Sequence, residues 1–184
     1  MQEKTHIAKG WLGREDTVCR GDRLARLEWI ASFVPDSQLL LFPGGWVAKY
    51  LFEEAWYCFV YGQFMSTVVL GLAFAERTLA ALFYGAGRND LERAPITVLL
   101  REGKEVGWLT DDEYRQLDEV RTLRNPIAHF RAPLAVDTVE RRSVEGDQLP
   151  YDVLEEDARK VLRVVFHLVR RNAVQRAGQP GETM

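Results

Sequence analysis

The chain has 184 residues, of which 47% are hydrophobic and 28% are charged. This length favours one domain with a sizeable buried core, and the composition argues against a globally disordered chain. The net charge of −3 argues against a general polyanion binder, which is usually basic overall, so any contact with nucleic acid has to come from a local cluster of arginines.

The cysteines and the start of the chain indicate the cellular compartment of the protein. Cys19 and Cys58 are far apart and lack the spacing of a metal site, which fits a reducing cytoplasm better than a disulfide-built secreted fold. No apolar stretch follows the charged N-terminus, so no signal peptide is predicted and the chain is expected to be cytoplasmic. The sequence contains no cluster of histidines, cysteines and acids, and neither a metal nor a cofactor is predicted.

Residues 1–46 are predicted to form an N-terminal extension. Residues 1–19 show no clear hydrophobic period and are expected to be a loose arm, followed by a short helix that begins at Asp22. The apolar run at 39–42 is stopped by a Pro-Gly-Gly turn signal. This run is either a strand or a tucked loop.

A long central helix is predicted over Val47–Tyr84, with a break near Gly62. Gly62 and Gly71 are small enough for a neighbouring backbone to approach closely. Glu76 lies deep in this apolar stretch, and its carboxylate needs a partner if it is buried. That partner would belong either to an ordinary salt bridge or to a functional site.

The same stretch needs a membrane test. Residues 55–75 carry no charged side chain and are long enough to cross a bilayer. Polar residues interrupt the run, acids rather than a basic cluster flank it, and the helical pattern continues beyond it. A buried helix is therefore the favoured interpretation, a membrane span is the alternative, and no contact with a membrane is expected.

The next two helices are predicted from their capping signals. Asp90 is a candidate cap for a helix at 91–102, with Pro95 in its first turn. Thr110 and Glu113 form a capping box, in which each side chain can bond the backbone amide of the other. The helix that begins there is expected to run on to the functional segment.

The rest of the chain completes an all-α prediction. Residues 131–150 are expected to be loop-like, with a short strand or hairpin at 136–139. A last amphipathic helix is predicted over 152–175, and 177–184 are expected to be a disordered tail. The long central helix should pack against this last helix and against the one at 110–130 in a helical bundle.

The segment at 121–131 carries the functional argument. On an ideal helix Asn125 and His129 share a face, whereas Arg124 and His129 are five residues apart, about 140° around the axis, and do not converge. Pro126 lacks an amide donor and disfavours helical geometry at the residue before it. A kink or a helix restart at Pro126 would aim both side chains into one cleft.

These residue types suit phosphate chemistry. A guanidinium stays charged and offers a fork of donors to phosphate oxygens, and an imidazole transfers a proton near neutral pH. His129 could then deprotonate a ribose 2′-hydroxyl, which attacks the adjacent phosphate while Arg124 stabilises the added charge. A structural alternative stays open, in which Arg124 pairs with Glu76 or Asp118 and His129 caps a helix end.

The segment from Arg124 to His129 resembles the Arg-x(4–6)-His motif of HEPN domains, which are helical domains that often act as metal-independent ribonucleases. The polar residue after the arginine, here Asn125, is typical of them, and the order of helices over residues 47–175 also fits. The resemblance implies a HEPN-like helical domain at 47–176. It implies that Arg124 and His129 form the catalytic pair, that Asn125 orients them and that Glu76 supports Arg124.

The resemblance also implies partners. RNA is the expected substrate, and two copies are expected to pair so that both motifs face one cleft at a homodimer interface, with Arg121 and Arg131 as RNA-binding residues. An antitoxin or regulatory protein is a further expected partner, since the family includes toxins and proteins of phage defence. Some of these toxins carry a tyrosine at the position of Arg131, so silencing by modification of that tyrosine is not expected here.

Three hypotheses follow. The first is a metal-independent endoribonuclease of HEPN type, with His129 as general acid or base and Arg124 stabilising phosphate charge. The second is a catalytically inactive HEPN-like module that binds a nucleotide or a protein. The third is a structural helical oligomer, in which both side chains make internal hydrogen bonds.

Overall fold

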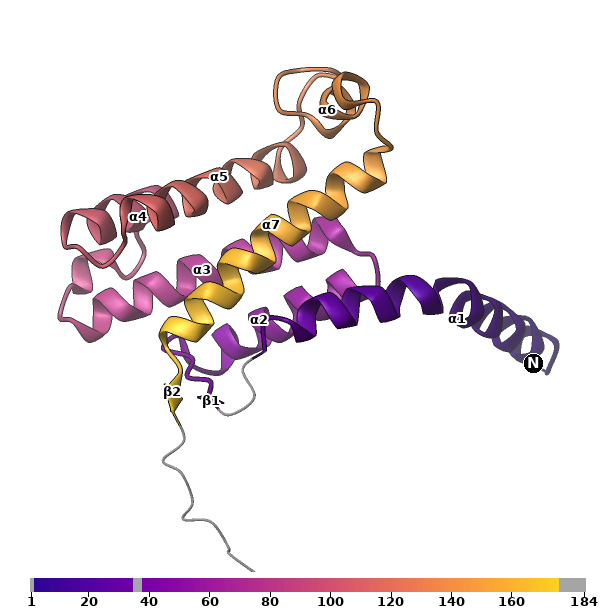
Figure 1. The fold of residues 1–184 in the computed structure, drawn as a ribbon, viewed down its shortest axis with the longest axis horizontal. Coiled ribbons are helices and arrows are strands. Elements are labelled where there is room, and N and C mark those ends of the chain that lie inside the picture. Colours follow the sequence, from indigo (N-terminus) through magenta and orange to yellow (C-terminus); the bar gives the residue numbers. More distant parts are fainter. Residues whose placement is uncertain (1, 35–37, 176–184) are drawn as a thin grey trace, which may run out of the picture.

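The computed structural model describes residues 2–34 and 38–175, and these fold as an all-α helical bundle (Figure 1). The helices are α1 (Gln2–Ala31), α2 (Gly45–Val60), α3 (Phe64–Gly85), α4 (Ile96–Glu105), α5 (Asp111–Ala128), α6 (Val139–Gly146) and α7 (Pro150–Arg171), with one 3-10 turn, η1 (Asn89–Leu91). Two short strands, β1 (Gln38–Leu39) and β2 (Val174–Gln175), pair antiparallel. The predicted fold class is confirmed, and the tail predicted at 177–184 lies outside the described residues.

Helix α3 is the centre of the bundle and contacts α2, α4, α5 and α7 (Figure 1). Its side chains Val68, Leu72, Phe74 and Leu79 are almost fully buried. Among the described residues α3 is also the one helix long and apolar enough to cross a membrane, and half of its most apolar window is buried inside the bundle. Burial of this kind is what the core helix of a bundle requires.

The predicted helix over Val47–Tyr84 is two antiparallel helices, α2 and α3. The break predicted near Gly62 is confirmed, and it turns the chain back on itself. Gly62 has φ +73°, in the left-handed region that glycine adopts without strain. A Cβ at this position would also collide with the hydroxyl of Tyr151 in α7.

Gly71 allows the close approach of α3 to α7. A Cβ at Gly71 would lie 2.5 Å from Cγ1 of Val161, a buried β-branched side chain with little rotamer freedom in a helix. Gly71→Ala is therefore expected to lower the free energy of unfolding by about 1–3 kcal/mol, as measured by urea denaturation. Gly13→Ala is the control, because nothing lies within 4 Å of that site in α1. Equal stability of the two variants would contradict close packing at Gly71.

Helix α1 differs most from the prediction. The expected loose arm and short helix are one helix of 30 residues. Its C-terminal part belongs to the bundle, where Trp29 and Ile30 join the core and Arg26 donates to Oε2 of Glu155 in α7 at 3.1 Å. Its N-terminal half projects from the bundle (Figure 1). That half shows no hydrophobic period because no other described part of the chain packs against it.

The segment predicted as a loop contains α6. The side chain of Thr138 caps this helix by accepting from the amide of Arg141, and the strand or hairpin predicted at 136–139 is wrong. Capping satisfies a free amide at the helix start, and this local bond outweighs the alternating pattern. Helix α7 begins at Pro150, in the first turn where the missing amide donor costs nothing.

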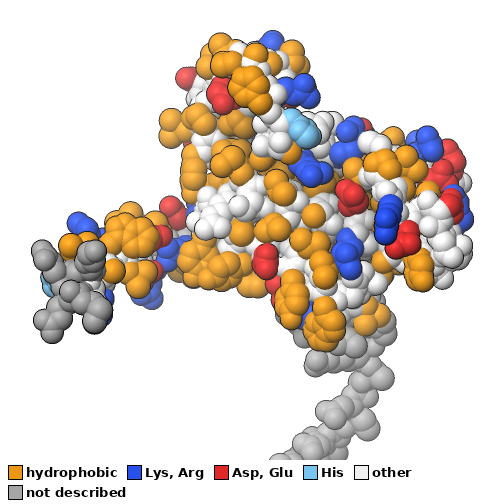
Figure 2. Space-filling view, turned by 180° about the vertical axis from the view of Figure 1, so that it is seen from behind, with side chains coloured by type: hydrophobic (Ala, Val, Ile, Leu, Met, Phe, Trp, Pro, Cys, Tyr) orange, Lys and Arg blue, Asp and Glu red, His pale blue; other side chains and the backbone are white. Residues whose placement is uncertain are grey.

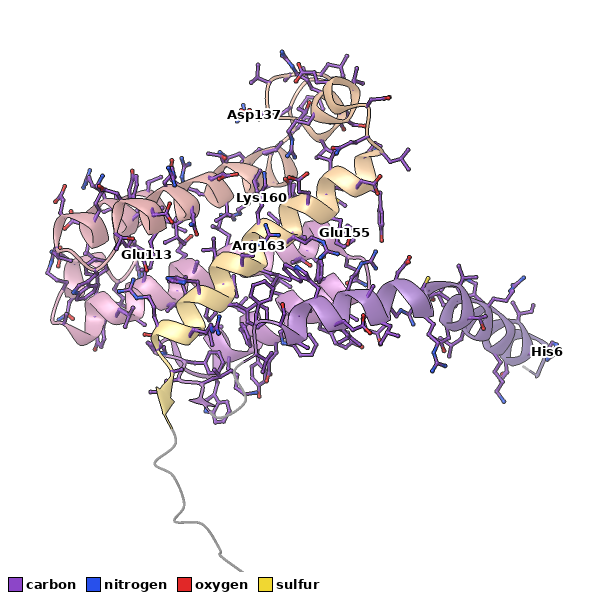
Figure 3. The ribbon with its side chains drawn as sticks, viewed as in Figure 1. His6, Glu113, Asp137, Glu155, Lys160 and Arg163 are labelled. Atoms are coloured by element: carbon purple, nitrogen blue, oxygen red, sulfur yellow. The ribbon has the colours of Figure 1, made fainter. Side chains whose placement is uncertain are left out.

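The capping box at Thr110 is confirmed, and Glu113 also ties α5 to α7. The Thr110 amide donates to Oε2 of Glu113 at 2.7 Å, and Oε1 lies 2.8 Å from Nε2 of His167 and from Nη1 of Arg171 (Figure 3). Burial raises the pKa of Glu113. Hydrogen bonds from Thr110 and His167 and the charge of Arg171 outweigh that effect and lower the pKa from 4.5 to about 2.

Glu113→Gln is expected to lower the free energy of unfolding by about 1.5–3 kcal/mol at pH 7, because hydrogen bonds to a charged group are lost. The folded pKa of Glu113 is about 2 and its ordinary value is 4.5, so its contribution is complete above about pH 4.5 and disappears as the pH falls towards 2. Urea denaturation at several pH values should show the two proteins converging over this range. The exposed Glu105→Gln is the control, and a constant difference down to pH 2 would contradict the prediction.

Candidate functional site

The Arg–His segment forms the last turn of α5. The helix continues through Pro126 to Ala128, and His129 is its C-cap with φ −130° and ψ 135°. Of the two distortions predicted at Pro126, a kink or a helix restart, the restart does not occur. A proline is tolerated here because it removes a single hydrogen bond, the one to the carbonyl of the exposed Thr122, which water can reach.

Arg124 is exposed and lines a pocket of about 700 Å³. Its guanidinium has no hydrogen bond or ion pair with any other residue that the structure describes. Glu76, its predicted support, lines the same pocket from α3 but forms no ion pair with it. Asp118, the other candidate partner, pairs with Arg121, with Oδ1 at 2.7 Å from Nε.

Two further arginines line this pocket, Arg77 of α3 and Arg93 between η1 and α4. Arg77 donates from Nε to the carbonyl of Gly44 at 2.9 Å, which leaves its terminal nitrogens unbonded within the described part of the chain. Arg93 makes no polar side-chain contact there. Three arginines outnumber the two acids, Glu76 and Glu92, so the pocket carries a net positive charge.

The remaining wall of the pocket is mainly apolar. It is formed by Pro43, Gly44, Leu51, Ala73, Ala80, Ala81, Tyr84 and Ala94. A site with apolar walls and a few convergent cations can hold an anionic group together with a flat or apolar one. The sequence motif pointed to Arg124 but missed Arg77 and Arg93, because no spacing in the sequence links them to it.

His129 does not line this pocket. Its side chain is exposed and has no polar contact in the described ranges, while its amide donates to the carbonyl of Asn125 at 3.0 Å. Arg124 lies in the last helical turn of α5, whereas His129 has left the helical conformation as the C-cap of this helix. The single chain therefore presents both side chains to solvent without bringing them into one pocket.

The two predicted RNA-binding arginines differ in their burial and in their ion pairing. Arg121 is half-buried and paired with Asp118, whereas Arg131 is exposed and has no polar partner in the part of the chain that the structure describes. Phe130, between His129 and Arg131, is 91% exposed. Arg131 and Phe130 therefore extend the open surface at this end of α5.

Comparison with known proteins identifies no relative: no family model, no curated protein and no solved structure matches the chain. The resemblance to HEPN domains therefore rests on the motif and the order of helices in the sequence. Within the described ranges, no three histidine, cysteine, aspartate or glutamate side chains come together as a potential metal site.

Proposed function

We propose that the chain is a metal-independent endoribonuclease of HEPN type. The observation that supports this proposal is that Arg124 and His129 are both exposed and that neither makes a polar side-chain contact with the described residues. An exposed arginine and histidine whose side chains bond no described residue contribute little to folding. A purely structural role, in which they make internal hydrogen bonds, is thus the least supported of the three hypotheses.

The proposed reaction needs one base and one fixed cation. His129 takes the proton of a ribose 2′-hydroxyl, the oxygen attacks the adjacent phosphorus, and the bond to the 5′-oxygen breaks as this oxygen takes a proton from water. Arg124 stabilises the negative charge that develops on the phosphate oxygens. Asn125 orients the pair, Arg131 adds a phosphate contact, and the products end in a 2′,3′-cyclic phosphate and a 5′-hydroxyl. Such an activity would suit phage defence or a toxin with an antitoxin partner.

A second candidate is a module that binds a nucleotide or RNA phosphate without cleaving it. The observation in its favour is that the pocket contains Arg77, Arg93 and Arg124 but not His129. Guanidinium groups bind phosphate oxygens through paired donors, and this needs no proton transfer. In this candidate Arg124 keeps its role and His129 has none.

The experiment is to incubate the protein with RNA in EDTA and to identify the new ends. Wild type should release 2′,3′-cyclic phosphate ends, and His129→Ala should be slower by about 10²–10⁴-fold, the usual contribution of a general acid or base. His6→Ala is the matched control, because His6 lies at the outer end of the projecting arm (Figure 3). Equal cleavage by wild type and His129→Ala would discard the nuclease. RNA binding without cleavage, weakened by Arg77→Ala and Arg93→Ala, would establish the second candidate.

A further inference from the structure

Helix α2 carries large apolar side chains on two opposite faces. One face, with Ala48, Phe52, Ala55 and Phe59, is buried in the core. The opposite face and the C-cap present four aromatic residues to solvent, which we call the aromatic stripe: Trp46, Tyr50, Tyr57 and Tyr61, exposed by 44–73%. Large aromatic side chains that gather on one exposed face of a helix often mark a contact with another molecule, so the stripe indicates an interaction surface.

The rings of the stripe are already arranged in two pairs. Trp46 stacks on Tyr50 with 6.4 Å between ring centroids, and Tyr57 packs on Tyr61 at 4.6 Å. Paired rings form a preorganised surface that loses little side-chain entropy when it is covered.

Nucleic acid is a poor match for the stripe. Single-stranded nucleic acid stacks on aromatic rings, but it also needs cations for its phosphates. The cations beside the stripe are already neutralised: Lys49 pairs with Glu53 at 2.5 Å, and Arg23, which lies over the Tyr61 ring, pairs with Glu15 and Asp16 at 3.0 Å each. A protein surface is therefore the better match.

The spacing of the stripe points to a second copy of this chain. The intervals between its residues read the same from either end, and their midpoint lies between Glu53 and Glu54. If two α2 helices pack antiparallel about a two-fold axis at that midpoint, Trp46 faces the partner's Tyr61 and Tyr50 faces the partner's Tyr57. A two-fold interface requires a surface of this self-complementary kind.

The stripes alone are too small for a stable interface, so the projecting part of α1 has to contribute to it as well. An aromatic side chain buries about 150–250 Å², and these four are about half exposed, so the stripes alone supply roughly 400 Å² per copy, against about 800 Å² per partner in a stable complex. The arm of α1 exposes a further apolar set: Ile7, Trp11, Leu12 and Val18, exposed by 54–80%. Hydrophobic side chains are visible along this arm in Figure 2.

The direction of the arm fits the same two-fold axis. The arm leaves the bundle beyond the Tyr61 end of α2, and the bundle itself extends beyond the Trp46 end (Figure 1). In an antiparallel pair, the partner's bundle would then lie alongside the arm. An isolated helix of this length is only marginally stable in water, which also favours a covered arm.

We propose that two copies of this chain associate through α2, with their aromatic stripes packed antiparallel and with the arm of each copy lying against the partner. This inference does not depend on the ribonuclease proposal. It differs from the pairing that the HEPN resemblance implies, because α3 and α7 pack against both α2 and α5 and lie between them (Figure 1). No residue of the stripe lines the pocket at Arg124.

The test measures molar mass by light scattering after gel filtration, with circular dichroism to verify folding. Wild type should be a dimer at micromolar concentration. Tyr50→Glu and Tyr57→Lys should each weaken dimerisation at least tenfold, because each copy of the dimer then brings one unpaired charge into the interface. Mixing the two variants should restore a dimer, since in the antiparallel arrangement the substituted side chains face one another. Trp11→Glu should weaken the dimer through the arm.

Tyr84→Glu is the control, since Tyr84 is an exposed aromatic outside the stripe, and this variant should remain dimeric. A monomeric wild type would overturn the proposal. So would variants of the stripe that stay dimeric while Phe130→Glu dissociates, since the copies would then pair through the end of α5. Failure of the mixture to recover would overturn the antiparallel arrangement.

Discussion

Arg124→Ala is expected to slow RNA cleavage by about 10²–10³-fold, the usual cost of removing one fixed donor that faces the charge of a transition state. Because the Arg124 side chain bonds no described residue of its own chain, the melting temperature should be unchanged. Single-turnover kinetics with a defined RNA, together with a thermal melt, measures both quantities. A loss in kcat with little change in substrate affinity would indicate that Arg124 acts mainly in the transition state.

Arg115→Ala is the matched control for this experiment. Arg115 is an exposed arginine near the start of the same helix, paired with Asp112, so its removal changes the net charge equally without touching the pocket. Cleavage that falls equally in both variants would show that only overall charge matters. Unchanged cleavage in Arg124→Ala would remove this residue from the reaction.

Asp157→Ala is expected to lower the free energy of unfolding by about 3 kcal/mol, because breaking a buried ion pair leaves a charge without its partner. The Asp157 side chain is 1% exposed and accepts two hydrogen bonds from Arg142, at 2.8 Å to Oδ1 and 2.5 Å to Oδ2. Hydrogen bonding to Asp157 raises the pKa of Arg142 above its ordinary value. This pair joins α6 to α7, so the loop that follows His129 should also loosen.

Chemical denaturation of Asp157→Ala measures this loss. Arg142 keeps 29% of its side chain exposed and can reach water when Asp157 is removed, which sets the expected cost at the lower end of the range for buried pairs. Glu156→Ala, the neighbouring exposed acid on α7, should change stability by less than about 0.5 kcal/mol. Comparable losses in the two variants would contradict a special role for the buried pair.

The sequence-based predictions succeeded at the start of α5 and failed at α1 and α6, each for its own reason. Thr110 and Glu113 lie three residues apart and contain their whole capping interaction, so the start of α5 was predicted correctly. The length of α1 was not, because a helix that projects from the bundle lacks the hydrophobic period that marks a packed one. For α6, an alternating pattern suggested a strand, but the cap at Thr138 decided the local structure.

At the candidate site, too, the sequence predicted some residues and missed others. The residue types and spacing of Arg124 and His129 could be recognised in the sequence, and whether they act on RNA stays a proposal. The contribution of Arg77 and Arg93 could not be predicted, because they reach Arg124 through the packing of α3 and of the segment before α4 against α5. The partner of Arg124 was also undecided between Glu76 and Asp118, and Asp118 pairs with Arg121 instead.

By itself the sequence determined the all-α class, the break near Gly62 and the cap at Thr110, because each depends on residues close together in the chain or on a repeated hydrophobic pattern. The tertiary structure alone decided which arginines share a pocket and which face of α2 the described residues leave uncovered. Those features depend on how distant helices pack, since packing determines which surfaces are buried and which remain available to a partner.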